Sequence, residues 1–189
     1  TTEQVSKILK YCNETGVKVV ARGAGTSLSG GALPLADAVM LGLGKFNQIL
    51  NIDYANRAVV TQPGVTNLSI SEAVSDADFY YAPDPSSQRA CTIGGNIAEN
   101  SGGPHCLAYG VTTNHVLGME VVLADGSITW FGDNERDGIG YDLRGITIGS
   151  EGTLAIVTKI SVRLLRLPEH VKTMLMSFET IEDASAAVT

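Results

Sequence analysis

Apolar residues recur along the chain at two spacings, one typical of helices and one typical of strands. The helical spacing stands at the start, where Val5, Ile8, Leu9 and Cys12 share one face and predict a helix over residues 2–15. Elsewhere short β-branched or alternating runs predict strands, separated by turn residues. The expected strands cover residues 17–21, 39–43, 49–53, 58–62, 116–123, 127–131 and 153–165, and further helices cover 66–75 and the end of 92–100.

Two pairs of these strands are expected to form hairpins. Residues 49–53 and 58–62 flank a four-residue turn, and the strands at 116–123 and 127–131 flank Asp125-Gly126, a strong turn signal. Because helices and strands do not alternate regularly, the pattern is typical of an α+β fold.

The character of the sequence changes after Pro168. A strand over residues 172–178 and a helix over 181–188 are expected there, with nothing before them in the sequence on which to pack. We therefore expect one domain over residues 1–168 and the beginning of a second over 169–189. On this interpretation the chain is truncated at both ends.

Composition narrows the classes of protein to consider. With 189 residues, 44% hydrophobic and 17% charged, the chain can bury one full core. Its net charge of −7 and the absence of a Lys/Arg run argue against a nucleic-acid partner. No apolar run approaches the roughly 20 residues of a membrane helix, and no signal peptide is recognisable.

The three cysteines favour a reducing compartment. Cys12, Cys91 and Cys106 are odd in number and lack CxxC spacing, so neither a disulfide framework nor a zinc site is expected. His105 and Cys106 are adjacent, but no second pair would complete a tetrahedral site, so we expect no metal. A cytoplasmic location follows from this cysteine usage.

The glycines are clustered, and the first cluster is Arg-Gly-Ala-Gly-Thr-Ser-Leu-Ser-Gly-Gly at 22–31. It is not a Rossmann fingerprint, because Leu28 stands where the third glycine belongs, and it lacks the lysine of a Walker A loop. Successive backbone N–H groups, with the hydroxyls of Thr26 and Ser27, could still hold phosphate oxygens. A purely structural glycine loop is the alternative.

Further loops of similar composition point to a long ligand. Residues 61–65, 83–87, 92–98 and 149–154 each place glycine or proline beside small hydroxyl residues. A single phosphate would need only one such loop, whereas several indicate an extended polar ligand.

Taken in order, these motifs resemble a known family. R-G-A-G-T-S-L-S-G-G, P-D-P-S-S, T-I-G-G-N-I-A-E-N-S-G-G-P-H-C-L-A-Y-G, Y-D-L-R-G and G-S-E-G-T-L-A-I-V are similar to the FAD-binding (PCMH-type) domain of the vanillyl-alcohol-oxidase superfamily. Within it, the resemblance points to the branch of glycolate oxidase FAD subunits and D-lactate dehydrogenases, near D-2-hydroxyglutarate dehydrogenase. It implies a two-subdomain α+β fold with FAD bound, followed by a cap domain.

The resemblance assigns roles to individual residues of the loops. The glycine loop would wrap the diphosphate, the loops at 83–98 would line the flavin ring and ribityl chain, and the loop at 151 would close the adenosine side. For Ala98 and Ile156, simple core packing is the alternative. The complete expected set is Arg22, Gly23, Ala24, Gly25, Thr26, Ser27, Gly30, Gly31, Pro63, Gly64, Pro83, Ser86, Ser87, Thr92, Gly94, Gly95, Ala98, Gly103, Gly110, Glu151, Gly152 and Ile156.

The chain departs from the family pattern in two respects. Covalent members often carry a histidine at the end of the first loop, where this chain has Thr-Ser-Leu, so non-covalent FAD is expected. The substrate arginine, metal-binding histidines and catalytic base of the 2-hydroxy-acid branch belong to the cap domain, so none is assigned here. His105 is expected near the flavin, His115 and His170 on the surface, and Arg144 with Glu151 as a structural ion pair.

The reaction implied by the resemblance is hydride transfer from the α-carbon of a small 2-hydroxy acid to flavin N5, while a base takes the hydroxyl proton. Electrons would pass on to an iron–sulfur partner subunit and the respiratory chain, and through such partners the protein could lie at the periphery of the inner membrane. Residues 1–189 alone are expected to bind FAD and to turn over nothing. Two alternatives remain: a related flavoprotein with another substrate, such as a cell-wall sugar reductase or an alkyl-ether lipid synthase, or a non-catalytic nucleotide-binding module.

Overall fold

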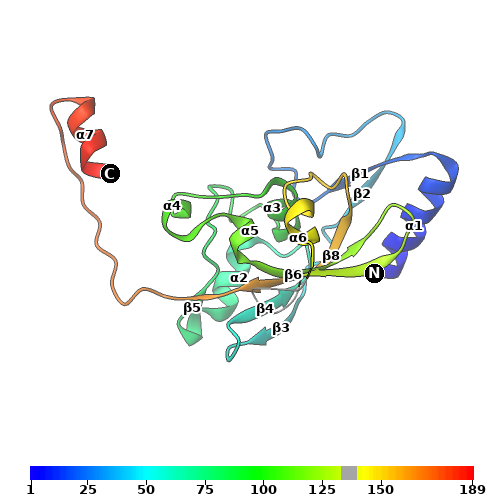
Figure 1. The fold of residues 1–189 in the computed structure, drawn as a ribbon, viewed down its shortest axis with the longest axis horizontal. Helices are drawn as coiled ribbons and strands as arrows, with labels where there is room; N and C mark the ends of the chain where they lie inside the picture. The colour runs from blue at the N-terminus through cyan, green and yellow to red at the C-terminus, as the bar shows by residue number, and fades with distance from the viewer. Residues whose placement is uncertain (133–139) are drawn as a thin grey trace.

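The computed structural model describes residues 1–132 and 140–189, and its centre is an antiparallel sheet (Figure 1). The five strands lie in the order β3-β4-β8-β6-β7. Both predicted hairpins are present, as β3–β4 and β6–β7. The strands are β3 (Ile49–Asp53), β4 (Ala58–Thr61), β6 (Val116–Val122), β7 (Ile128–Gly132) and β8 (Ile156–Arg163).

The sheet is buried along its central strands. Almost every residue of β6 and β8 is inaccessible, because helices and loops cover both faces of these two strands. Met119 and Ile160 belong to the main core, together with Ile70 of α2 (Asn67–Val74) and Ile97 of α3 (Ile93–Glu99). Thr66 and Thr92 cap these two helices through their side-chain oxygens, which fixes where each helix begins.

A second unit contains α1 (Thr2–Thr15) and the parallel pair of β1 (Lys18–Arg22) and β2 (Ala38–Gly42). Thr1 and Gln4 form a capping box, and Gly16 ends α1 in the left-handed conformation at φ 71°. Val5 and Leu9 of the helix pack with Leu41 of β2 and with Val122 and Ile156 of the large sheet. This small core joins the two units and leaves the loop after β1 beside α3 (Figure 1).

Short elements complete the described residues. They are η1 (Ser75–Ala77), β5 (Phe79–Tyr80), α4 (Cys106–Tyr109), α5 (Thr112–His115), α6 (Leu143–Thr147), β9 (Leu165–Arg166) and α7 (Ile181–Val188). The predicted strand at 153–165 is interrupted: a turn precedes Ile156, and β9 leaves β8 to pair with β5.

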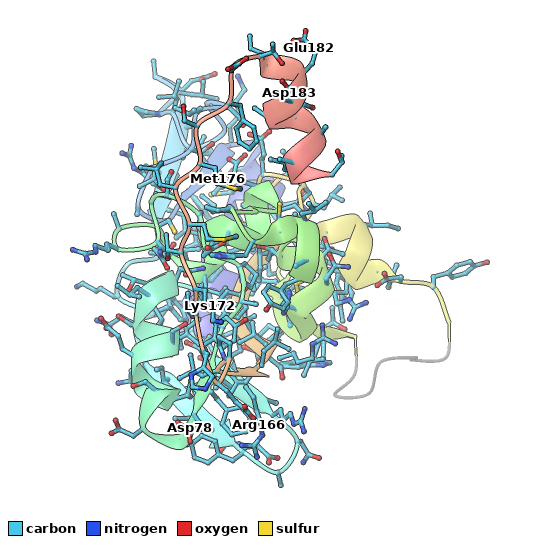
Figure 2. All side chains as sticks on the ribbon, turned by 90° about the vertical axis from the view of Figure 1, so that its left-hand side faces the viewer. Asp78, Arg166, Lys172, Met176, Glu182 and Asp183 are labelled. Carbon is cyan, nitrogen blue, oxygen red and sulfur yellow. The ribbon has the colours of Figure 1, made fainter. Side chains whose placement is uncertain are left out.

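The segment after β9 corrects one expectation. Residues 172–178 form no strand; they run as an extended segment past Lys172 and Met176 to α7, the helix expected at 181–188 (Figure 2). Their apolar side chains are exposed, among them Leu175 and Met176. A strand needs a hydrogen-bonded neighbour, and this segment has none among the described residues.

Candidate cofactor-binding site

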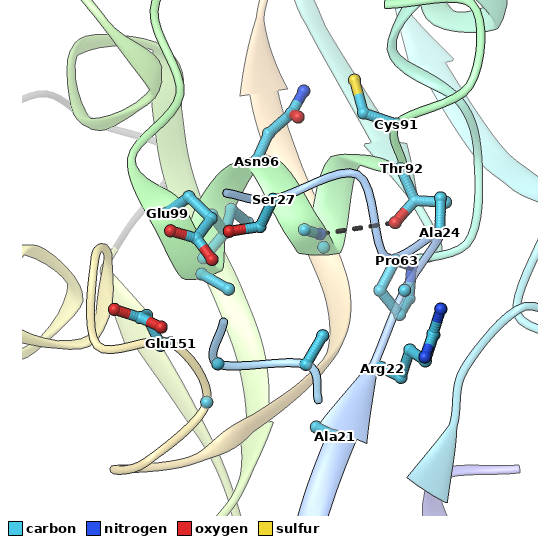
Figure 3. A pocket seen from close by; sticks show the side chains of 18 of the residues that line it. Ala21, Arg22, Ala24, Ser27, Pro63, Cys91, Thr92, Asn96, Glu99 and Glu151 are labelled. Carbon is cyan, nitrogen blue, oxygen red and sulfur yellow. Dashed lines mark hydrogen bonds between the residues drawn. The ribbon is translucent and has the colours of Figure 1, made fainter. Parts of the chain in front are cut away.

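A cavity of about 310 Å³ lies where the two units meet (Figure 3). Its walls come from the loop after β1, Pro63 after β4, the start and face of α3, the turn at 150–152 and the first residues of β8. All the glycine- or proline-containing loops identified in the sequence thus reach one cavity, although the loop at 83–87 does so only through Ser87. The volume of the cavity lies in the range of ordinary ligand pockets.

The loop after β1 offers hydrogen-bond donors that the rest of the chain leaves unused. Within the described part of the chain, the backbone N–H groups of residues 23–28 donate no hydrogen bond. Arg22 also lines the cavity, its guanidinium lies beside Gly25 of the same loop, and no carboxylate of the described residues lies within ion-pair distance of it. Unused amides and an unpaired cation fit a diphosphate, because both give charge-assisted hydrogen bonds to anionic oxygens.

Glycines allow the walls of the cavity to approach one another. A Cβ on Gly23 would lie 2.5 Å from Oγ1 of Thr92, the oxygen that caps α3. A Cβ on Gly94 would lie 2.6 Å from Cβ of Pro63. These positions hold glycine because three loops far apart in sequence touch there, and any side chain would push them apart.

The opposite wall is the turn at 149–152, fixed to the end of α3. The N–H of Gly149 donates to the carbonyl of Ile97 at 2.8 Å, and that of Glu151 to Ala98 at 2.9 Å. The carbonyl of Ala98 would otherwise be free at the helix end, whereas that of Ile97 also accepts the N–H of Asn100 at 3.3 Å. The carboxylate of Glu151 lies against Gly31, and Glu99 accepts a hydrogen bond from Ser29 at 3.0 Å.

The charges of the cavity are therefore separated along the glycine loop. Arg22 lies at the start of the loop, whereas Glu99 and Glu151 lie at its end (Figure 3). An anionic group is favoured near Arg22 and disfavoured near the two carboxylates. The arrangement suits a ligand with charge in one part and neutral polar groups in another.

Most of the residues expected from the sequence line this cavity. They are Arg22, Gly23, Ala24, Gly25, Thr26, Ser27, Gly31, Pro63, Ser87, Thr92, Gly94, Gly95, Ala98, Glu151, Gly152 and Ile156. The residues that do not line it are Gly30, Gly64, Pro83, Ser86, Gly103 and Gly110.

Several of these outlying residues have visible packing or turn functions instead. The space beside Gly64 is filled by the carbonyls of Phe46 and Leu43, and the space beside Gly103 by the backbone and side chain of Asp84. Gly110 ends α4 with φ 83°, a conformation that favours glycine. Pro83 accepts a hydrogen bond from Asn67 at 2.9 Å, which anchors the loop to α2.

The lining also contains residues that the sequence reasoning did not select. Polar examples are Cys91, Asn96, Glu99, Ser101 and Ser150. Asn96, Glu99, Ser101 and Ser150 lie inside motifs already quoted, so their proximity to chosen residues was the available signal. Nothing in the spacing indicates that Cys91 would face the cavity.

The structure places the three histidines in different surroundings. His115, expected on the surface, is completely buried; its Nε2 lies 2.8 Å from the carbonyl of Tyr109, and burial lowers the pKa of its imidazole. His170 is exposed, as expected. His105 does not line the cavity; it is 68% exposed, and its Nδ1 lies 2.6 Å from a carboxylate oxygen of Asp84.

The expected pair between Arg144 and Glu151 is also wrong. Arg144 instead donates to the carbonyl of Val116 at 2.8 Å and lies 3.4 Å from Asp142. It therefore connects α6 to the start of β6. Its partners come from nearby backbone groups that sequence spacing does not reveal.

Two features are absent from residues 1–132 and 140–189. No group of three or more His, Cys, Asp or Glu side chains there is arranged to hold a metal ion. Among the helices of the same residues, none has both the length and the apolar character to cross a bilayer.

Comparison with known proteins places this geometry in context. A family model described as an FAD binding domain matches residues 1–132. The glycolate oxidase subunit GlcD of Escherichia coli (strain K12) is 50% identical over 186 residues, which are 98% of this chain and 37% of that protein. The D-lactate dehydrogenase of Archaeoglobus fulgidus is 39% identical over 188 residues, 99% of this chain and 42% of that protein.

A solved structure supports the fold. An alkyldihydroxyacetonephosphate synthase superposes with a TM-score of 0.78 at 22% identity, over 89% of this chain and 31% of that one. The chain thus spans about two fifths or less of the length of these relatives. Given the matched model and the ordered loops around one cavity, the chain belongs to the family of FAD-binding domains found in glycolate oxidase and D-lactate dehydrogenase flavoproteins.

Proposed function

We propose that this chain is the FAD-binding part of a flavin-dependent 2-hydroxy-acid oxidoreductase of the glycolate or D-lactate type, and that it holds FAD non-covalently in the cavity between the two units. The observation that carries the proposal is a cavity-lining loop whose N–H groups at residues 23–28 are unused, next to Arg22, whose guanidinium pairs with no carboxylate of the described residues. Donors of this kind match the diphosphate of a dinucleotide.

Each wall of the cavity has a task in this proposal. The glycine loop and Arg22 bind the diphosphate, and Pro63, Thr92 and Gly94 hold the loops in contact so that water is excluded. Glu99 and Glu151 lie where uncharged parts of the cofactor belong. Bound FAD would supply a two-electron acceptor for the α-hydrogen of the substrate, while the chain supplies orientation and electrostatics.

A titration with FAD tests the proposal directly. The protein should quench flavin fluorescence and shift the flavin absorbance bands on binding. Arg22→Gln should lower the affinity for FAD roughly 10- to 100-fold, because a hydrogen bond to a charged group contributes about 1.5–3 kcal/mol to binding. Arg89→Gln, which removes the same charge from an exposed residue outside the lining, should leave the affinity unchanged.

The result that contradicts the proposal is saturable FAD binding that is equally strong in Arg22→Gln, or no binding at all. A colourless protein that does not bind added FAD would favour the alternative of a non-catalytic nucleotide-binding module.

The mode of attachment needs a separate measurement. No histidine lines the cavity among the described residues, but Cys91 does. On our proposal, all flavin should remain in solution after the protein is precipitated with acid. Flavin retained in the wild-type pellet and lost from a Cys91→Ser pellet would show a thioether bond and overturn non-covalent binding.

The substrate is proposed as a small 2-hydroxy acid, from the names of the relatives. A mitochondrial D-2-hydroxyglutarate dehydrogenase of Danio rerio is also 39% identical over 172 residues, so a larger 2-hydroxy diacid is a second candidate. Turnover of glycolate, D-lactate and D-2-hydroxyglutarate by the full-length enzyme separates them. An iron–sulfur partner subunit and a cytoplasmic location remain proposals, the latter on the odd cysteine number alone.

A further inference from the structure

A groove separate from the cofactor cavity lies between α1 and the end of β2. Its volume is about 580 Å³, and its walls come from the first half of α1, from residues 41–46 and from the two glutamines that join β3 and β4 to that segment. This side of the molecule carries the N-terminus, at the right of Figure 1. Leu43 is the one described residue that lines both spaces, so the groove is not an extension of the cofactor cavity. We call it the α1 groove.

The floor of the α1 groove is apolar. It consists of Val5, Ile8, Leu41, Leu43 and Phe46. Three of these side chains are buried members of the small core that joins the two units, whereas Ile8 and Phe46 pack against that core and stay partly accessible. Such a surface favours a ligand with a hydrocarbon part, because covering apolar area removes it from water.

The rim of the groove carries cations and no anions. Lys7 of α1 and Lys45 belong to the lining, which contains no Asp or Glu among the described residues. Neither lysine has an ion pair or a hydrogen bond with another described residue. The whole chain has a net charge of −7, so these two unpaired lysines run against its overall charge. A negative group placed between them is attracted by both.

Two glutamines of the rim also present donors. The side-chain oxygen of Gln4 accepts from the backbone nitrogen of Thr1 at 2.7 Å, and that of Gln62 accepts from the N–H of Gln48 at 3.0 Å. A backbone nitrogen of this kind can only donate, so the oxygen of each amide faces it and the NH₂ group is turned away. Neither NH₂ group bonds to another described residue. The rim therefore offers unused donors together with two positive charges.

We propose that the α1 groove is a binding site for an amphipathic carboxylate. Its carboxylate accepts hydrogen bonds from Lys7, Lys45 and the glutamine NH₂ groups, and its hydrocarbon chain lies on the apolar floor. The volume of the groove falls within the range of small-molecule sites. This inference goes beyond the proposed function, because the site is separate from the cofactor cavity and its ligand is not the cofactor.

Titration calorimetry with decanoate provides the test. One decanoate per chain should bind saturably, and decyltrimethylammonium, which has the same chain and the opposite charge, should bind at least tenfold more weakly. Along the series from hexanoate to decanoate the affinity should rise roughly two- to fourfold for each added methylene, as expected when the chain is removed from water. Prior saturation with FAD should leave the affinity for decanoate unchanged.

A pair of substitutions locates the carboxylate. Lys7→Gln combined with Lys45→Gln should lower the affinity for decanoate about tenfold, because each exposed charge contributes only a factor of a few. Lys10→Gln combined with Lys172→Gln removes the same charge from exposed residues outside the lining and should change nothing. Circular dichroism should show the same fold in both double variants.

Three outcomes would overturn the inference. The first is an absence of saturable binding, and the second is equal binding of decanoate by the wild type and by the variant without Lys7 and Lys45. The third is displacement of decanoate by FAD, which would place the fatty acid in the cofactor cavity. Failure of the protein to bind FAD refutes the proposed function alone, since the decanoate series and the lysine variants still decide this inference.

Discussion

Replacing Gly64 by alanine should destabilise the protein without touching the cavity. The added Cβ would lie 2.6 Å from the carbonyl oxygen of Phe46 and 2.8 Å from that of Leu43, against an ordinary contact of 3.4 Å or more. Both neighbours are backbone, and the N–H of Gly64 donates to the same Phe46 oxygen. The segment cannot move aside without losing that hydrogen bond.

The expected magnitude follows from these contacts. Overpacking costs about 1–3 kcal/mol, and backbone neighbours on two sides place Gly64→Ala in the upper part of that range, at about 2–3 kcal/mol. For a chain of this size, the melting temperature should fall by roughly 4–12 °C. Urea denaturation followed by circular dichroism gives the free energy of unfolding directly.

A matched substitution provides the control. Gly44 has no atom within 4 Å of its Cβ position, so Gly44→Ala should be neutral or slightly stabilising. If the two variants unfold at the same denaturant concentration, the reasoning from close carbonyl contacts is wrong. If Gly64→Ala is stable but fails to bind FAD, Gly64 acts at the cofactor instead.

Three further changes test the buried His115, the hydrogen-bonded carboxylate of Glu120 on β6 and the contact of Arg144 with β6. Burial lowers the pKa of His115, so as the pH drops the imidazole takes up a proton in the unfolded chain before it does so in the folded protein. The free energy of unfolding should therefore fall between pH 7 and pH 5. In urea titrations at a series of pH values, His115→Asn should show a weaker dependence of the free energy of unfolding on pH. Burial alone would raise the pKa of Glu120, but hydrogen bonds from Lys159, Thr158 and Thr2 outweigh burial and lower that pKa. Glu120→Gln should therefore reduce the free energy of unfolding by about 1 kcal/mol at pH 7. The difference between variant and wild type should vanish once the pH falls below the lowered pKa of Glu120. Arg144→Leu should lower the melting temperature by a few degrees through the freed carbonyl of Val116, and an unchanged melting curve would contradict that function of Arg144.

Local patterns were sufficient to predict most elements of the fold. The helical spacing at Val5 and Leu9, the Asp125-Gly126 turn and the β-branched run before the glycine loop all depend on neighbours in sequence. The cavity was predicted in the same way, because glycine clusters reveal where backbone must approach closely. Single residues excluded the Rossmann and Walker A motifs, which left two interpretations of residues 22–31: a loop whose N–H groups hold phosphate oxygens, or a purely structural glycine loop.

Errors arose where distant residues decide the outcome. His115 is buried, and its ring lies edge-to-face against that of Tyr81 with the ring centroids 6.0 Å apart, a contact between segments far apart in sequence that local patterns cannot show. The segment at 172–178 has the apolar composition of a strand but no neighbour to pair with in the described residues. Asn96 lines the cavity although it was not among the expected residues, because the glycines before it in the motif indicate backbone contacts and nothing about its side chain.

The order of the strands in the sheet determines when the sheet can be completed during synthesis. β8 separates β4 from β6, so the two hairpins remain unconnected until residues 156–163 have left the ribosome. The walls of the cavity come from the same late region and from the loop after β1, more than a hundred residues earlier. A cofactor could therefore be captured only after most of this chain has been made, and such long-range pairing is expected to make folding slow.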